Sequence, residues 1–434
     1  MGMNGSPPPG RRAAVVAGLR TPFVKAGTDF KNLGAEDLGA LLVNELVARS
    51  GIAPKEFDAV VFGQVIPSKT VTLIGREMVL RTQLPRDVQA YTVDRACATS
   101  IQAATDAADQ INLGHSSCVI AGGTESLSDA PIFATRTLAQ ALVEVSRAKT
   151  MAERIKIFTR LRPRDFTPEP PALKEPTTGL TMGESAEIMA QKNGISRAAQ
   201  DAFAYQSHAR AAAAWEAGRF DGEVMHVPVP PRYDKVSSRD NIVRKDTTLE
   251  ALGALRPVFD RRYGTITAGN ASPLTDGAAA LILMAEEKAK ALGLKPLGYV
   301  KSYAYAALDP RDQLLQGPAY AAPVALDRAG LELKDMDLVD MHEAFAAQVL
   351  SNLQFFASKA FAEKLGRPRP MGEVDPAKLN VNGGSIALGH PFAATGARMI
   401  LQTLRELERR GGQHALLTVC AAGGLGASMV LERQ

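Results

Sequence analysis

The sequence predicts an α/β fold made of two similar layered halves, and three observations support this class. Apolar runs such as 13–19 alternate with helical patterns such as 36–50, as expected when buried strands and helices pack in layers. Parts of this pattern occur twice along the chain. A length of 434 residues with 46% hydrophobic residues is sufficient for two or three ordinary domains.

The repeated pattern is visible in two pairs of segments. Residues 48–65 align with 327–344, and each segment contains a helix end at a glycine, a short loop and a strand. The strand-like run that ends at Gly123 aligns in the same way with the run that ends at Gly424. Repeats this far apart indicate a duplicated domain rather than a solenoid. We therefore expect two halves related by a pseudo-twofold axis, with the functional site between them.

The composition of the chain suggests where these halves begin and end. We expect a disordered leader at 1–12, and an N-terminal half formed by 13–130 together with 263–294. An inserted loop domain, which would cover the substrate, is expected at 131–262, and the C-terminal half at 295–434.

Charge and cysteine content exclude several classes of protein. The net charge of +4 gives no global field for nucleic acid, so no nucleic-acid partner is expected. Three cysteines in a long chain cannot form a disulfide framework and indicate a reducing compartment. Because no signal peptide and no run of 18 apolar residues are found, we expect a cytoplasmic protein.

One part of the insertion, residues 136–165, is locally basic, with eight Lys and Arg residues against three acidic ones. Its apolar residues recur mostly every three or four positions, which predicts an amphipathic helix that ends at the proline-rich run 163–171. These residues are Leu138, Leu142, Val145, Met151, Ile155 and Phe158. The helix has three interpretations, which are a solvated face, a docking site for a partner subunit, and a contact with an anionic membrane.

Cys97 is the first candidate for chemistry, because it follows a strand-like segment and a turn and precedes a helix expected from about residue 98. The positive end of a helix dipole lowers the pKa of a thiol and favours the nucleophilic thiolate. The alternative is that Cys97 is a small buried apolar residue, which is how we interpret Cys118.

Three further candidates lie at similar junctions of strand and helix. His390 is in a glycine-rich segment, 383–398, where it can act as a general base or as a donor to an oxyanion. Cys420 precedes a glycine turn whose N–H groups can line an oxyanion hole. His342 begins the segment HEAFA, which lacks the second histidine of a zinc HExxH motif, so metal binding is disfavoured.

Together these motifs resemble those of the thiolases. RACATS with Cys97 resembles the motif of the acylated nucleophile, GHP with His390 that of its base, and CAAGG with Cys420 that of the acid/base cysteine. The segment 264–280 resembles the family's CoA-contacting segment. The resemblance extends from about residue 13 to 432 and implies a thiolase-like fold of two halves related by a pseudo-twofold.

His342 stands where most thiolases have asparagine, and this resembles the thiolase subunit of the fatty-acid-oxidation trifunctional complex. The resemblance implies cleavage of 3-ketoacyl-CoA by CoA to acetyl-CoA and a shortened acyl-CoA in fatty acid β-oxidation. It implies a homodimer, a partner α-subunit with hydratase and dehydrogenase activity, and a location that includes the periphery of the inner membrane. CoA is then a co-substrate, and no metal or redox cofactor is required.

The resemblance also implies a role for each candidate. Cys97, deprotonated by His390, would attack C3, while His342 and His390 hold the thioester oxygen of the acetyl unit. Cys420 would protonate the leaving enolate and later deprotonate CoA. The backbone N–H groups of Cys97 and Ala422 would form the second oxyanion hole.

The binding residues are carried over by motif position. Ser272 and Ala268 would contact the pantetheine of CoA, and Met182 and Phe345 would line the acyl or pantetheine pocket or serve as plain core residues. The family commonly has histidine before this methionine, where the chain has Thr181.

Two other functions compete with this one. A β-ketoacyl synthase-like condensing enzyme would use Cys97, His342 and His390, but it generates its carbanion by decarboxylation and needs no second cysteine. A scaffold or lipid-binding subunit with degenerate catalysis is permitted by the basic segment 136–165.

Overall fold

The computed structural model describes residues 11–169 and 174–434. Most of the leader expected at 1–12 therefore lies outside the described residues. Its last two residues form salt bridges with the folded part of the protein, Arg11 with Glu287 and Arg12 with Glu432.

The N-terminal half contains six strands, four α-helices and a 3₁₀ turn within the described residues. These are β1 (Ala13–Arg20), β2 (Val24–Lys25), α1 (Ala35–Ser50), η1 (Pro54–Glu56), β3 (Ala59–Gly63), α2 (Ile74–Leu80), β4 (Gln89–Val93), α3 (Thr99–Asn112), β5 (Cys118–Glu125), β8 (Thr275–Ala285) and α9 (Glu286–Ala291).

The C-terminal half follows a similar order. Its elements are β9 (Gly298–Ala307), η3 (Leu314–Gln316), α10 (Gly317–Ala329), η4 (Leu333–Asp335), β10 (Leu338–Met341), α11 (Ala346–Ala357), α12 (Lys359–Lys364), α13 (Ser385–Leu388), α14 (Thr395–Arg410), β11 (His414–Ala421) and β12 (Leu425–Glu432).

The order of the strands shows the duplication directly. They follow one another as β4-β3-β5-β8-β1-β9-β12-β11-β10, and β1 and β9 meet antiparallel at the centre. On either side of this pair the same relations recur, because β3 and β5 are parallel, as are β10 and β11. β5 runs antiparallel to β8, and β11 runs antiparallel to β12. The predicted α/β class and the relation between the halves are confirmed.

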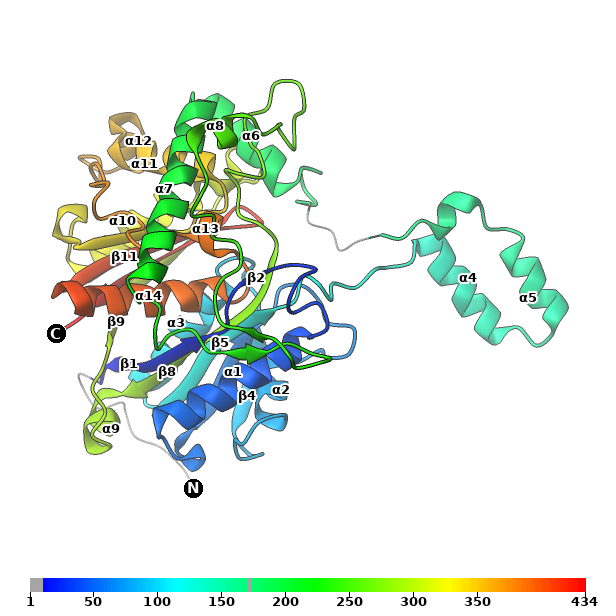
Figure 1. Ribbon diagram of the computed structural model, residues 1–434, viewed down its shortest axis with the longest axis horizontal. Helices are drawn as coiled ribbons and strands as arrows, with labels where there is room; N and C mark the ends of the chain where they lie inside the picture. The colour runs from blue at the N-terminus through cyan, green and yellow to red at the C-terminus, as the bar shows by residue number, and fades with distance from the viewer. Residues whose placement is uncertain (1–10, 170–173) are drawn as a thin grey trace.

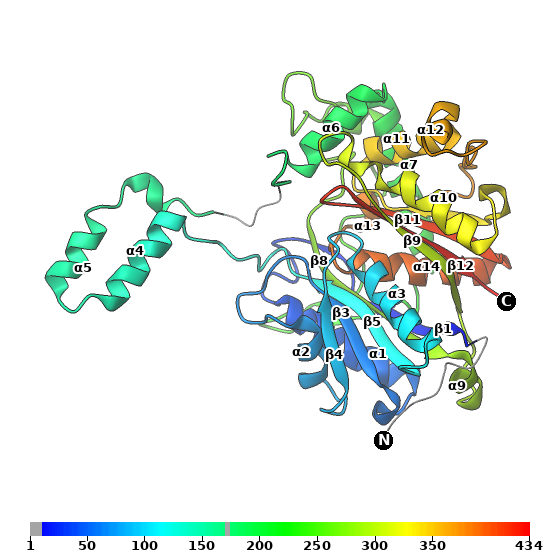
Figure 2. The same cartoon turned by 180° about the vertical axis from the view of Figure 1, so that it is seen from behind.

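The halves pack as layers around a central pair of helices. α3 and α14 lie between the two parts of the sheet, and their apolar residues share one buried cluster with inward-facing residues of β5, β8, β11 and β12 (Figure 1). α1 covers the outer face of the N-terminal part, and α10 and α11 cover that of the C-terminal part (Figure 2). The starts of α3 and α14 therefore lie in the middle of the molecule, where both halves meet.

The aligned segments occupy equivalent positions in the two halves. α1 ends at Gly51 and α10 ends at Gly330, and both glycines have φ = 68°, the left-handed conformation in which glycine has no steric penalty. A 3₁₀ turn and a strand follow each glycine. The repeat therefore encodes one helix-turn-strand unit used twice.

The insertion contains helices of two kinds. Its elements are α4 (Arg136–Arg147), α5 (Met151–Phe158), η2 (Pro163–Phe166), α6 (Met182–Lys192), α7 (Arg197–Glu216), β6 (Val227–Pro228), β7 (Val236–Ser237) and α8 (Leu249–Gly253). α6 and α7 pack on α11 of the body, whereas α4 and α5 form an arm that projects from it (Figure 1).

The arm corrects the prediction of a single amphipathic helix over 136–165. The chain becomes extended at Ala148, and Thr150 caps a second helix by accepting from the N–H of Glu153, whose side chain accepts from the N–H of Thr150. This capping box starts a new helix, because its hydrogen bonds satisfy N–H groups that a continuous helix would have bonded internally. No helix among the described residues combines the length and apolar character needed to cross a bilayer.

The two edges of the sheet differ. At the edge formed by β10, the N–H of Val339 donates to the carbonyl of Lys378 and its carbonyl accepts from the N–H of Asn380, so a neighbouring segment covers this strand. At the opposite edge, β4 pairs only with β3 among the described strands.

Candidate active site

The turn between β4 and α3 places Cys97 at the middle of the molecule. Ala96 has φ = 46°, a left-handed conformation that is costly for a residue with a Cβ. The hydroxyl of Thr99 accepts from the N–H of Arg95 at 2.8 Å, and the N–H of Ala98 donates to the carbonyl of Arg95 at 3.0 Å. These bonds fix a tight, strained turn with Cys97 directly before the cap of α3, which begins at Thr99, close to the predicted position.

The environment of Cys97 corrects the expectation of a lowered pKa. Burial raises the pKa of the Cys97 thiol to about 12, and the backbone N–H groups of Ala422 and of Cys97 itself oppose this shift only in part. Desolvation of the thiolate therefore outweighs the helix end, and the thiol is neutral in the resting site. A neutral thiol needs a base to become a nucleophile.

His390 lies in a turn that requires glycine. Gly389 has φ = 100°, and the N–H of His390 donates to the hydroxyl of Thr275 at 2.8 Å. Nδ1 of His390 lies 2.7 Å from the hydroxyl of Thr395, which donates its own proton to the carbonyl of Pro391 at 3.0 Å. The Thr395 oxygen therefore accepts from Nδ1–H, and Nε2 of His390 is left with a free lone pair.

This imidazole is neutral. Burial, together with the charge of Arg398, lowers the pKa of His390 to about 3. His390 is therefore unprotonated at neutral pH, and Nε2 keeps the lone pair that a general base needs.

His342 lies beside His390, directly after β10. Its N–H donates to the carbonyl of Thr418 at 2.9 Å, and its Nδ1 lies 3.0 Å from the hydroxyl of Ser385. The two imidazole rings are 4.1 Å apart between centroids. Burial, His390 and Arg398 hold the pKa of His342 well below its usual value.

The thiol of Cys97 and one nitrogen of each histidine lie within 4.8 Å of one another. Among the described residues, this is the group whose composition could hold a metal ion. A metal there would occupy the thiol and both imidazoles, whereas the free groups form a nucleophile, a base and a second imidazole within reach of one substrate.

Cys420 is the buried penultimate residue of β11, and its side chain borders the same cavity as Cys97 and His390. Burial, and then the nearby Cys97, raise the pKa of its thiol well above the usual value, so it carries its proton at rest. The turn to β12 places Gly423 and Gly424 at positive φ, while Ala422 is outside the positive-φ residues of the described chain. Alanine at position 422 therefore carries no steric penalty relative to glycine. The backbone N–H of Ala422 faces the thiol of Cys97.

Glu125 is a site residue that the sequence analysis missed. It ends β5, and its buried carboxyl accepts from the N–H groups of Val65, Ile66 and Ala393, which lie on two separate loops. Burial raises the pKa of Glu125 to about 8. This one side chain connects a wall of the site to the loop that follows His390.

Gly123 in the same strand allows this loop to approach closely. A Cβ built on Gly123 would lie 2.1 Å from the carbonyl oxygen of Ala393, which is far inside van der Waals contact. The GHP loop therefore packs directly on the backbone of β5.

A cavity of about 770 Å³ opens onto the cysteines, a volume typical of ligand pockets. Three of the predicted binding residues, Ser272, Met182 and Phe345, line it, and so does Thr181, whose hydroxyl caps α6. Ala268 is exposed in a turn and does not line the cavity. Most of the apolar wall carries no motif in the sequence and was not predicted; it includes Val65, Ile66, Phe133, Phe259, Leu315 and Phe392.

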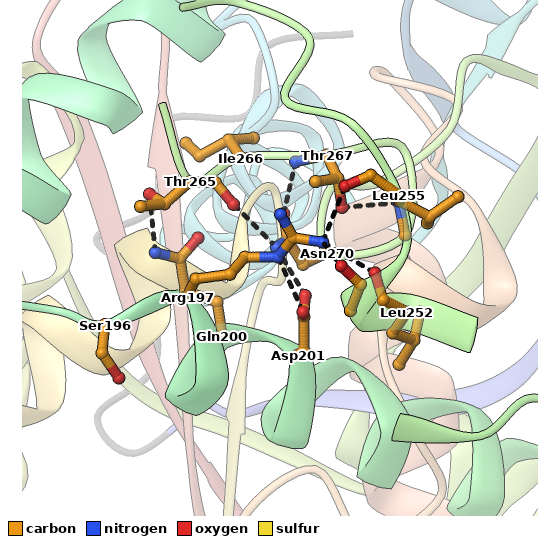
Figure 3. Close-up of polar contacts among 12 residues, drawn as sticks. Ser196, Arg197, Gln200, Asp201, Leu252, Leu255, Thr265, Ile266, Thr267 and Asn270 are labelled. Atoms are coloured by element: carbon orange, nitrogen blue, oxygen red, sulfur yellow. Dashed lines mark hydrogen bonds and ion pairs between the residues drawn. The ribbon is translucent and has the colours of Figure 1, made fainter. Parts of the chain in front are cut away.

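A buried polar network holds the segment before Ser272. Asp201 of α7 accepts from Arg197 at 2.7 Å and from the amide of Asn270 at 2.9 Å, and Asn270 in turn accepts from the N–H of Thr267 at 2.8 Å (Figure 3). The N–H of Ser272 then donates to the carbonyl of Ala344, two residues after His342. The insertion and the HEAFA segment thereby fix one wall of the cavity.

The buried histidines predict a measurable dependence of stability on acid. The unfolded chain binds a proton at His390 near pH 6.5, whereas the folded chain resists it until about pH 3, so stability is lost as the pH falls through this range. We expect His390→Asn to flatten the slope of unfolding free energy against pH by about 1.4 kcal/mol per pH unit. Urea unfolding between pH 4 and 6.5 measures this slope, and equal slopes for the variant and the wild type would contradict the prediction.

Comparisons with known proteins agree with this site. Residues 13–287 match the family model "Thiolase, N-terminal domain", and 294–433 match "Thiolase, C-terminal domain". The 3-ketoacyl-CoA thiolase of Yersinia enterocolitica is 54% identical over 98% of this chain and 97% of its own, and that of Photobacterium profundum is 53% identical over 98% of both.

Solved structures are similar over nearly the whole chain as well. Human mitochondrial 3-ketoacyl-CoA thiolase in complex with CoA superimposes with a TM-score of 0.82, at 33% identity over 98% of both chains. The acetyl-CoA acetyltransferase of Bacillus anthracis gives a TM-score of 0.83, at 34% identity over 97% of this chain and 98% of its own. The chain belongs to the thiolase family.

Proposed function

We propose that this protein cleaves 3-ketoacyl-CoA with CoA, giving acetyl-CoA and an acyl-CoA shortened by two carbons, as a step of fatty acid β-oxidation. The observation that carries the proposal is the meeting of two protonated thiols, Cys97 and Cys420, with two neutral imidazoles beside an apolar cavity. The names of the curated relatives support the same substrate class.

The first half-reaction uses all four groups. His390 takes the proton of Cys97, and the thiolate adds to C3 of the substrate. The C2–C3 bond then breaks, so that the acyl chain stays on Cys97 and the acetyl unit leaves as an enolate. His342 and His390 hold the enolate oxygen, and Cys420 gives its proton to the carbon, which releases acetyl-CoA.

The second half-reaction returns each group to its starting state. Cys420, now a thiolate, takes the thiol proton of an incoming CoA, whose sulfur attacks the acyl carbon. The N–H groups of Cys97 and Ala422 bind the oxygen of the tetrahedral intermediate. The Cys97 thiolate leaves and recovers its proton from His390, and the shortened acyl-CoA departs.

The cavity supports the binding roles of three residues. Ser272 would contact the pantetheine, and Met182 and Phe345 would line its path or that of the acyl chain, since all three border the cavity. Ala268 would contact CoA only where the ligand reaches the surface of the protein. CoA enters as a co-substrate, and the steps above need no resident cofactor.

We expect Cys97→Ala to lower kcat on the order of 10⁴- to 10⁶-fold, as loss of a nucleophile does in other enzymes. Cys420→Ala removes a general acid and base and should lower kcat by about 10²- to 10⁴-fold. The assay follows the absorbance of 3-ketoacyl-CoA after addition of CoA, for short, medium and long chains. Cys118→Ala is the matched control, because Cys118 is buried in β5 and does not line the cavity.

The same variants separate thiolysis from decarboxylative condensation. A condensing enzyme of the synthase type would retain turnover of a malonyl thioester after Cys420→Ala, and that result would overturn the proposal. Absence of thiolysis in the wild type at every chain length would favour a scaffold or lipid-binding role.

We also propose that the protein is a homodimer joined at β4. The backbone of this strand is unpaired on its outer side among the described residues, whereas a neighbouring segment covers β10 at the other edge. An open edge strand is a template for pairing with another chain. A second copy on this edge would extend the sheet across the dimer.

Analytical ultracentrifugation is expected to give twice the chain mass of 46.1 kDa. Hydrogen exchange should show protected amides throughout 89–93, because pairing with a second copy leaves no free N–H on the outer side. A monomer mass together with rapid exchange at alternate residues of β4 would contradict the dimer.

The insertion is proposed as a loop domain over 131–262 with two tasks. Its α6 contributes Met182 to the cavity wall and covers the substrate. We propose that its arm, α4 and α5, rests on an anionic membrane. Leu138, Val145 and Ile157 are half-buried, whereas Leu142, Met151, Ile155 and Phe158 are exposed.

Exposed apolar side chains on a segment of net charge +5 are suited to the interface of an anionic bilayer. The three free cysteines support a location in the cytoplasm, from which this arm would reach the inner membrane. The alternative is that the arm contacts a partner α-subunit instead of a membrane.

Flotation with phosphatidylglycerol vesicles tests the membrane proposal. The wild type should float with these vesicles and not with phosphatidylcholine alone, and reversal of Arg154, Lys156 and Arg160 to glutamate should abolish flotation while thiolysis is unchanged. A control variant reverses three exposed cations of the body, Lys295, Arg311 and Lys334.

The control should float like the wild type. If the arm variant also floats, the membrane proposal is wrong. If the arm variant then fails to co-purify with a hydratase/dehydrogenase subunit, the arm is assigned to the contact with that subunit.

A further inference from the structure

We propose that Arg398 and Ser385 are positioning residues that hold His342 as the tautomer with its proton on Nε2, so that His342 always donates and never acts as the base. The two histidines would then differ in role although their rings lie 4.1 Å apart. The kinetic part of this inference rests on the proposed function.

Two neighbouring groups fix the direction of the Ser385 hydroxyl proton. Nη2 of Arg398 donates to the Ser385 hydroxyl oxygen at 2.9 Å, and a guanidinium has no acceptor to offer in return. The other partner of this oxygen among the described residues is Nδ1 of His342, at 3.0 Å. Since the hydroxyl proton has no other acceptor there, it points to Nδ1, which must carry a lone pair.

The second nitrogen of His342 follows from the first. A neutral imidazole with a lone pair on Nδ1 has its proton on Nε2. Nε2 of His342 is buried and has no protein partner among the described residues, and the same is true of Nε2 of His390. His390 lines the cavity, and one nitrogen of His342 lies within 4.8 Å of His390 and of the Cys97 thiol.

His390 has its proton on Nδ1 instead, and this tautomer also follows from a neighbouring hydroxyl. The Thr395 hydroxyl gives its proton to the Pro391 carbonyl, so Nδ1 of His390 must be the donor to Thr395. The pair thus presents one N–H from His342 and one lone pair from His390. This is the combination that an oxyanion donor and a base require.

Arg398 is a buried cation next to Ser385 and Asp340. Its side chain is 1% exposed, its Nε and Nη1 have no hydrogen-bond partner among the described residues, and Asp340 lies 3.9 Å away. Its charge also disfavours the imidazolium form of both histidines. Arg398 therefore orients the Ser385 hydroxyl, while burial is the main reason that His342 is neutral.

Magic-angle-spinning NMR of the full chain labelled with ¹⁵N-histidine tests the tautomer without any turnover. The wild type should show protonated Nε2 at His342 and protonated Nδ1 at His390, with signals assigned from His342→Asn and His390→Asn. A protonated Nδ1 at His342 would overturn the inference, whether or not the protein catalyses thiolysis.

Ser385→Ala provides the kinetic test. It removes the donor to Nδ1, so His342 should become a mixture of tautomers and kcat should fall by about 10- to 100-fold, as for other outer-shell partners, while KM for CoA stays unchanged. Ser385→Thr keeps the hydroxyl and should restore both the single tautomer and kcat. Ser351→Ala is the matched control, because Ser351 is fully buried in α11 and its hydroxyl has no partner there.

Two kinetic results would contradict the inference. Ser385→Ala with wild-type kcat and a single His342 tautomer would show that the hydroxyl does not position the ring. Equal losses in Ser385→Ala and Ser385→Thr, with the tautomer unchanged, would show a packing effect only. If the wild type shows the expected tautomers but no thiolysis, the proposed function fails and the tautomer assignment stands.

Discussion

Desolvation of the catalytic groups is the constraint on which the rest of the site depends. Burial removes charge from both cysteines and both histidines, so the resting site contains neutral thiols and neutral imidazoles. The role of each neutral imidazole then depends on which of its nitrogens carries the proton. The surrounding hydroxyls, backbone groups and the buried Arg398 therefore decide which group donates and which accepts. The same dry interior strengthens the hydrogen bonds that make these assignments.

The duplicated fold explains why such a site forms at the centre of the molecule. α3 and α14 are the inner helices of the two halves and pack against each other. Cys97 lies just before the start of one helix, and His390 lies just before the start of the other. One half therefore provides the nucleophile and the other provides the base from corresponding places. The symmetry stops there, because His342 and Cys420 both come from the C-terminal half.

Much of this arrangement could be predicted from the sequence, since the repeat indicated the two halves and the motif glycines indicated the turns around His390 and Cys420. The direction of the Cys97 pKa could not, because the depth of burial depends on how both halves pack. The break at Ala148 leaves no mark in the apolar periodicity, and its local signal is the capping-box pattern of Thr150 and Glu153. Ser385 and Thr395 lie five residues on either side of His390 in a segment already singled out, yet their roles follow only from three-dimensional hydrogen bonding.

The active site also constrains the residue type at position 123 in β5, which lies outside the catalytic groups. Any larger residue at position 123 would displace the loop that carries the base, because the carbonyl of Ala393 occupies the space where a side chain would begin. The close packing of the loop that follows His390 thus depends on a residue that performs no chemistry. A search for variants with altered chain-length preference would therefore do better to vary the apolar cavity wall than position 123, where even one added methyl group would displace the loop that follows His390.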